Sequence, residues 1–259
     1  MSPASVIYAS EWCCGALLLL SLLTWLVSTY KRDVSIVDGI WSLMIVSAAC
    51  VFALNLHELG PRVLWVLGLT AIWSVRLAAY ISWRNWGEPE DHRYQTIRNR
   101  NQPYFELKSL YLVFGLQAIL AAIISLPLLA ALASPRPINF LDFLGVIVFA
   151  TGLVVESLAD WQLARFKADA QNDGKVLDSG LWRYTRHPNY FGEFCVWWGF
   201  YFIALAAGAW WTVLSPLLMS LLLLKVSGVA LLESNIGERR PTYSAYIART
   251  NAFFPGPPR

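Results

Sequence analysis

Seven long apolar segments, separated by shorter polar stretches, dominate the pattern of this sequence. A helix that crosses the hydrocarbon core of a membrane needs about 20 predominantly apolar residues. Each segment is close to that length, so the pattern predicts an all-α, polytopic membrane protein with seven transmembrane helices. The expected helices are Trp12–Thr29, Ser35–Leu56, Arg62–Trp83, Leu110–Ala133, Phe140–Asp160, Tyr190–Gly208 and Trp210–Leu232.

Composition agrees with a membrane environment. Hydrophobic residues make up 57% of the chain and charged residues 14%, whereas soluble proteins carry roughly 25% charged residues. The net charge of +3 and the absence of a basic block argue against a nucleic-acid partner. The apolar composition makes the lipid bilayer the expected partner. The four cysteines lie in apolar runs without ligand spacing, which predicts no metal site. No repeat or linker is visible, and we expect one domain over residues 1–259.

Lysine and arginine are concentrated in alternate connecting segments. The segments after the first, third, fifth and seventh expected helices hold nearly all of them, and the opposite loops hold only Arg62 and Arg136. Short cytoplasmic loops carry an excess of basic residues. The pattern therefore places the N-terminus outside and the C-terminus in the cytoplasm, and a bacterial inner membrane is the expected location.

Charged residues inside the expected helices all lie toward the cytoplasmic face. They are Asp38, Arg76, Glu156, Glu193 and Lys225. Charges within a membrane are costly and usually face a cavity or a partner. This distribution indicates one polar cavity that opens to the cytoplasm. Alternatively, Asp38 and Arg76, which lie at matching depth, pair with each other and hold two helices together.

The densest polar pattern lies between the fifth and sixth expected helices. Glu156 and Asp160 are one helical turn apart, and the segment Gly180–Glu193 leads into the sixth helix. Asn189 and Glu193 share a face there at spacing i, i+4. Basic groups beside a helix N-terminus suit phosphates. Because neither GxGxxG nor GxxxxGK[ST] occurs, a nucleotide would be held without a Rossmann fold or a P-loop.

The sequence of Gly180–Glu193, GLWRYTRHPNYFGE, resembles the signature of bacterial steroid 5-alpha-reductase-like membrane proteins. Trp83–Tyr94 and the segment from Tyr243 to Pro255 are similar to that family too. A broader superfamily shares Arg-His-Pro-x-Tyr-x-Gly and includes sterol reductases and the isoprenylcysteine and phospholipid methyltransferases. The resemblance implies a seven-helix oxidoreductase that holds NADPH in its cytoplasmic half and reduces a lipophilic enone such as a 3-oxo-Δ4 steroid.

Matching positions imply the cofactor-binding residues. Glu156 stands where that family has asparagine, and Lys167 and Lys175 stand where it has arginines. A lysine offers a phosphate a point charge rather than a bidentate fork. The implied NADPH-binding residues are Glu156, Asp160, Arg165, Lys167, Lys175, Arg186, His187, Asn189, Tyr190, Glu193, Asn235, Arg239 and Tyr246.

The implied catalytic residues are Asp38 and Tyr80. Asp38 corresponds to the family's carbonyl-activating glutamate, and the partnering tyrosine position holds Trp73, so Tyr80 on the same helix is the candidate phenol. Hydride addition to the β-carbon of an enone builds negative charge on the carbonyl oxygen, which a buried acid or phenol stabilises. Three arginines of the third loop either hold phosphate or anchor the loop at the interface: Arg84, Arg93 and Arg98.

Two other functions remain open from the sequence. An S-adenosylmethionine-dependent methyltransferase acting on a lipid is one, although such relatives carry a Glu-Glu pair where this chain has Glu233 and Ser234. A channel or transporter is the other, and it predicts charges in both membrane halves. No obligatory protein partner is evident.

Overall fold

The computed structural model describes residues 3–226, 228–229 and 243–258, and all regular secondary structure in them is helical. Contacts divide the chain into two compact units. Unit 1 comprises Met1–Ile138 and Ala207–Ala209, and unit 2 comprises Asn139–Ala206 and Trp210–Arg259. Each unit holds one group of the predicted site residues.

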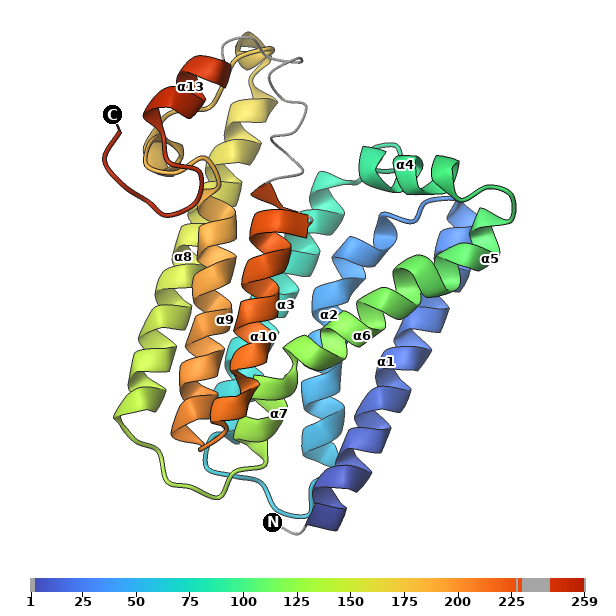
Figure 1. Cartoon of the computed structure of the whole chain (residues 1–259), viewed down its shortest axis with the longest axis vertical. Helices are drawn as coiled ribbons and strands as arrows, with labels where there is room; N and C mark the ends of the chain where they lie inside the picture. The colour runs from blue at the N-terminus through green and yellow to red at the C-terminus, as the bar shows by residue number, and fades with distance from the viewer. Residues whose placement is uncertain (1–2, 227, 230–242, 259) are drawn as a thin grey trace. The chain divides into compact units, whose positions relative to one another are not determined.

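Unit 1 is built on three long helices, in which α2 packs against both α1 and α3, and α6 crosses α1 and α2 (Figure 1). Shorter helices follow, and the segment η1 within them is π-helical. The bounds are α1 (Pro3–Lys31), α2 (Ile36–Leu54), α3 (Val63–Arg84), α4 (His92–Arg100), α5 (Phe105–Ser109), η1 (Leu110–Gly115), α6 (Leu116–Ile124) and α7 (Leu126–Leu132).

A reciprocal serine pair joins α2 to α3. The hydroxyl of Ser42 donates to the carbonyl of Ser74 at 3.0 Å, and the hydroxyl of Ser74 donates to the carbonyl of Ser42 at 2.6 Å. Both side chains are fully buried. Small hydroxyl residues let helix backbones approach closely and supply hydrogen bonds that lipid cannot. The pair therefore holds the helix that carries Asp38.

The fourth expected helix is interrupted. Helix α6 ends at Ile124 and α7 starts at Leu126, with Pro127 in its first turn. A proline has no backbone N–H to donate and clashes with the preceding turn, which accounts for the break.

Unit 2 is centred on the antiparallel pair α8 and α9, and α10 packs on α9 (Figure 1). Helix α8 opens with a capping box in which Asn139 and Asp142 satisfy each other's backbone N–H groups. The bounds are α8 (Phe140–Ala168), η2 (Ala170–Asn172), η3 (Gly180–Arg183), α9 (Pro188–Ala206), η4 (Trp210–Val213), α10 (Leu214–Leu221), η5 (Leu222–Val226) and α13 (Tyr243–Arg249).

Four glycines form the seam between α8 and α9. A Cβ at Gly145 would lie 2.7 Å from the carbonyl oxygen of Gly199, and one at Gly152 would lie 2.5 Å from that of Gly192. Within each helix the two glycines are seven residues apart, so they face the same side. The glycines let the two backbones touch, which is how helices associate where lipid removes the hydrophobic driving force.

Among the residues that the structure describes, five helical segments are long and apolar enough to cross a membrane, as in a multi-pass membrane protein: Pro3–Lys31, Ile36–Leu54, Val63–Arg84, Phe105–Ile124 and Phe140–Ala168. The stretch Trp210–Val226 is a shorter apolar helix. The last expected helix, Trp210–Leu232, runs into residues outside those described. The seven-helix count and the orientation therefore stay predictions.

Replacing Gly199 by alanine tests the seam. A Cβ there would lie 2.6 Å from the backbone nitrogen of Phe149, and overpacking of this kind costs about 1–3 kcal/mol. Gly68 of α3 is the matched control because nothing lies within 4 Å of its Cβ position. Thermal unfolding in detergent should show a lower midpoint for Gly199→Ala and no loss for Gly68→Ala. Equal midpoints for Gly199→Ala and the wild type would contradict the packing.

Candidate functional site

Asp38 is the centre of a hydrogen-bonded cluster in unit 1. It lies in the first turn of α2, and its side chain is 17% exposed. Arg93 Nη2 donates to Asp38 Oδ2 at 2.7 Å, and the Tyr94 hydroxyl donates to Asp38 Oδ1 at 2.6 Å. Both carboxylate oxygens thus accept from α4. The sequence identified Asp38 as a candidate but did not predict these two partners.

Asp91 sets the position of Arg93. It caps α4 by accepting from the backbone N–H of Arg93 at 2.9 Å, and Arg93 Nε also donates to it at 3.0 Å. Burial would raise the pKa of Asp91, but the side-chain and backbone hydrogen bonds of Arg93 outweigh burial and lower it. Burial likewise opposes the charge of Arg93, yet Asp38 and Asp91 raise its pKa. The guanidinium is therefore a fixed cation between two carboxylates.

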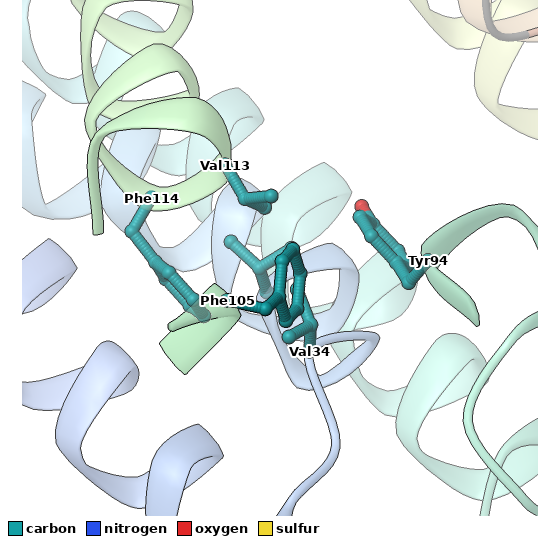
Figure 2. Close-up of a cluster of buried hydrophobic side chains, with 6 residues drawn as sticks. Val34, Tyr94, Phe105, Val113 and Phe114 are labelled. Carbon is teal, nitrogen blue, oxygen red and sulfur yellow. The ribbon is translucent and has the colours of Figure 1, made fainter. Parts of the chain in front are cut away.

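Tyr94 inserts its ring into the apolar core of unit 1. Figure 2 shows the ring at one side of Val34, Phe105 and Val113, with Phe114 beyond Phe105; together with Val37 these residues form a buried cluster. Burial first, and then the charge of Asp38, raise the pKa of Tyr94 well above its usual value. The phenol therefore keeps its proton over the whole physiological range and is a hydrogen-bond donor.

A second ion pair braces the same loop. Arg98 donates from Nε and Nη2 to the two carboxylate oxygens of Glu90 at 2.9 and 2.8 Å. Glu90 also accepts from the backbone N–H of Val34 at 2.9 Å, and the Arg98 guanidinium lies 4.7 Å from the ring centroid of Phe105. Arg93 and Arg98 thus bind carboxylates of their own unit. Of the two roles left open from the sequence, the geometry favours anchoring of the loop.

Tyr80, the phenol expected from the sequence, lies half-buried on α3. Its ring centroid is 6.1 Å from that of Trp83 and 6.0 Å from the guanidinium carbon of Arg84. Trp73, one of the residues with the largest fully buried side chains, fills the position where the resemblance expects a tyrosine. A catalytic role for Tyr80 stays a prediction.

In unit 2, polar side chains gather on the α8–α9 pair. Asn189 Nδ2 donates to Asp160 Oδ1 at 3.2 Å, and Trp197 Nε1 donates to Glu193 Oε1 at 2.9 Å. Glu156, Asp160 and Glu193 are all buried. The seam brings Glu156 to the level of Gly192, one residue before Glu193. The predicted carboxylates and the amide of Asn189 therefore do share one helix pair.

Arg186 contacts the C-terminal segment. Its Nη1 donates to the carbonyl oxygens of Thr250 at 2.6 Å and Ile247 at 3.3 Å, and its backbone N–H donates to the carbonyl of Asn251 at 2.9 Å. The side chain is buried. These contacts make Arg186 an anchor for the C-terminal segment, and the cofactor binding that the resemblance implied stays a prediction.

Two further contacts complete this anchor, which we call the C-terminal clasp. The buried Tyr246 hydroxyl donates to the carbonyl of Trp182, and Thr185 Oγ1 donates to the carbonyl of Phe253 at 2.8 Å. Burial raises the pKa of Tyr246. The clasp holds the segment that precedes α9, where the ring of His187 stacks on that of Tyr190 at 5.7 Å between centroids.

The remaining predicted cofactor residues are cationic and exposed, with the Arg165 guanidinium 5.5 Å from the ring centroid of Trp161. They are Arg165, Lys167 and Lys175. Asn235 and Arg239 lie outside the described residues. Buried carboxylates and an amide suit the hydroxyl and carboxamide groups of a dinucleotide, and exposed cations suit its phosphates, so the donor set of unit 2 fits NADPH. Among the residues described, no His, Cys, Asp or Glu group could hold a metal ion.

Comparison with known proteins places the chain in a family. Residues 24–250 match the family described as "Protein of unknown function (DUF1295)". The chain belongs to the DUF1295 family. The matched range contains every candidate site residue named above.

Relatives of this DUF1295 protein include the two that follow. An uncharacterized protein of Schizosaccharomyces pombe is 26% identical over 261 residues, which cover 89% of this chain and 75% of the relative. A probable O-methyltransferase, ustE, of Ustilaginoidea virens is 42% identical over 53 residues, which cover 20% of this chain and 18% of the relative. No solved structure matches.

Arg186→Gln should release the C-terminal clasp. The change removes a buried, charged donor from two carbonyls, which should cost about 2 kcal/mol of unfolding free energy. Arg183→Gln is the matched control because Arg183 is exposed in the same loop. Limited trypsin digestion should cut Arg186→Gln after Arg249 faster than it cuts either the wild type or the control. Equal cleavage rates would show that Arg186 does not hold this segment.

Tyr94→Phe should change how stability depends on pH. An unfolded tyrosine ionises near pH 10, and folded Tyr94 ionises at a higher pH. The stability that Tyr94 contributes is therefore complete below about pH 10 and declines above it, so the wild type loses its advantage over Tyr94→Phe there. Melting temperatures from pH 7 to 11.5 measure this. Tyr30→Phe, at a 90% exposed position, should follow the wild type, and parallel curves for Tyr94→Phe would contradict the assignment.

Proposed function

We propose that this protein is a membrane oxidoreductase that uses NADPH to reduce the C=C bond of a lipophilic enone, with 3-oxo-Δ4 steroids as the substrate class. In this proposal the chain spans a bacterial inner membrane seven times, with its N-terminus outside and its active site open to the cytoplasm. The observation that carries the proposal is the buried Tyr94 phenol, which is held by Asp38 while Asp38 is held by Arg93.

Tyr94 supplies what enone reduction needs from a protein. When hydride reaches the β-carbon, the carbonyl oxygen takes on enolate character and becomes a stronger hydrogen-bond acceptor than a carboxylate. The phenol hydrogen bond then moves from Asp38 to that oxygen, so it is strongest in the transition state. Arg93 keeps the Asp38 carboxylate paired in the meantime. Asp38 is in this role a positioning residue, and Tyr94 takes the place first expected for Tyr80.

Unit 2 would hold the cofactor, which supplies the hydride when bound. Asp160, Asn189 and Glu193 would bind its hydroxyl and carboxamide groups. The exposed Lys167 and Lys175 would bind phosphate as point charges, which favours NADPH over S-adenosylmethionine, whose sulfur is itself cationic. The resemblance of Gly180–Glu193 to steroid 5-alpha-reductase-like proteins supports the same assignment.

Cofactor stabilisation and turnover test this function together. NADPH at about 100 times its Kd should stabilise the purified protein by about 2.7 kcal/mol, with smaller effects from NADH and S-adenosylmethionine. Tyr94→Phe should respond to NADPH as the wild type does, yet reduce a 3-oxo-Δ4 steroid roughly 10²–10³-fold more slowly, the scale for one lost oxyanion donor.

The variants separate the possible errors. Tyr80→Phe measured alongside distinguishes the two phenols, and slowing of that variant alone would return the donor role to Tyr80. Tyr30→Phe, on an exposed part of α1, is the control for tyrosine removal as such. Stabilisation by S-adenosylmethionine alone would replace the reductase proposal with methyl transfer.

A further inference from the structure

An open cleft of about 620 Å³ lies in unit 1 at the polar end of α1. Its lining comes from the end of α1 and the residue just after it, from α4, from the loop that joins α4 to α5, and from α5: Thr29, Arg32, Arg98, Gln102 and Glu106. A small adjoining recess reaches the apolar side chains of Val34 and Phe105. The cleft is thus lined by polar and charged side chains with two apolar ones in the adjoining recess, and none of its lining residues is used in the proposed reaction.

Two charged side chains of the cleft, Arg32 and Glu106, are available to bind a ligand. Arg98 is neutralised by Glu90. The side chains of Arg32, Thr29 and Gln102 make no hydrogen bond or ion pair to the part of the chain that the structure describes. Glu106 meets Arg98 only through a long contact of 3.5 Å, and half of its side chain is exposed. The lining therefore offers three donors, one of which is the Arg32 cation, with a carboxylate nearby.

Apolar and aromatic side chains flank the cleft. Tyr30 on α1 and Leu107 and Tyr111 on α5 and η1 are exposed, and the indole of Trp25 donates to the backbone carbonyl of Glu106 at 2.8 Å. Tryptophan and tyrosine collect where acyl chains meet headgroups. The surface beside the cleft therefore suits acyl chains, which a soluble ligand would not need.

We infer that this cleft binds the headgroup of a phospholipid that carries a phosphate and a primary ammonium, as in phosphatidylethanolamine. Arg32, Thr29 and Gln102 donate to the phosphate, and Glu106 accepts from the ammonium. Phosphatidylcholine has no N–H to donate to Glu106, and phosphatidylglycerol has no cation to pair with it. The inference goes beyond the proposed reaction and is independent of it.

Lipid retention measured by native mass spectrometry tests this site. The full chain is reconstituted in an equal mixture of phosphatidylethanolamine, phosphatidylcholine and phosphatidylglycerol and then extracted with detergent. The wild type should retain phosphatidylethanolamine about tenfold more than either of the other lipids, the scale of one charge-assisted contact. Arg32→Gln should lose about tenfold of this retention, and Glu106→Gln should bring the three lipids within about twofold of one another.

Matched variants keep the result interpretable. Arg84→Gln and Glu88→Gln alter exposed charges of unit 1 that do not line the cleft, and they should retain lipid as the wild type does. Gln102→Leu removes a phosphate donor without a change of charge and serves if Arg32→Gln fails to fold. Equal retention of the three lipids by the wild type would overturn the inference. So would displacement of the lipid by soluble glycerophosphoethanolamine at equal concentration, which would make the site one for a free phosphoester.

Discussion

The hydrogen bonds from α4 to the Asp38 carboxylate are the interaction on which the candidate site of unit 1 depends. A carboxylate near the end of an apolar helix is stable only when its lone pairs are satisfied. Arg93 and Tyr94 satisfy them, and in doing so they fix the short helix α4 over the start of α2. Asp91 and Glu90 then hold two arginines of that helix, Arg93 and Arg98. Structural anchoring and proposed chemistry thus use the same atoms.

The helices were predictable because apolar length is a property of the chain alone. The expected ranges Ser35–Leu56 and Arg62–Trp83 lie within two residues of the observed α2 and α3 at each end. The expected Trp12–Thr29 and Phe140–Asp160 were too short, because α1 begins at Pro3 and α8 continues to Ala168. Hydropathy marks where a helix leaves the hydrocarbon, whereas the helix itself ends only where capping or the turn requires it.

The contacts of the site were less predictable because they join distant parts of the chain. Asp38 was identified from its charge within an apolar run, but Arg93 lies 55 residues away and its pairing depends on the fold of the α3–α4 loop. The GLWRYTRHPNYFGE motif indicated the correct segment. It could not show that Arg186 contacts backbone carbonyls. The sequence around an arginine is the same whether the side chain binds a phosphate or a distant segment of the backbone. For Arg93 and Arg98 the sequence did hold a signal. The acidic residues Glu90 and Asp91 lie close to them in the chain and indicate that these arginines have carboxylate partners within the protein.

The glycine seam of unit 2 also acts as a register lock. Sliding α8 along α9 by one residue, about 1.5 Å, would move each glycine away from its partner and bring a side chain such as that of Phe149 against backbone. The two helices can therefore pack in only one register along their axes. That register aligns Asp160 with Asn189, so four residues without side chains determine the height at which the polar groups of this unit meet.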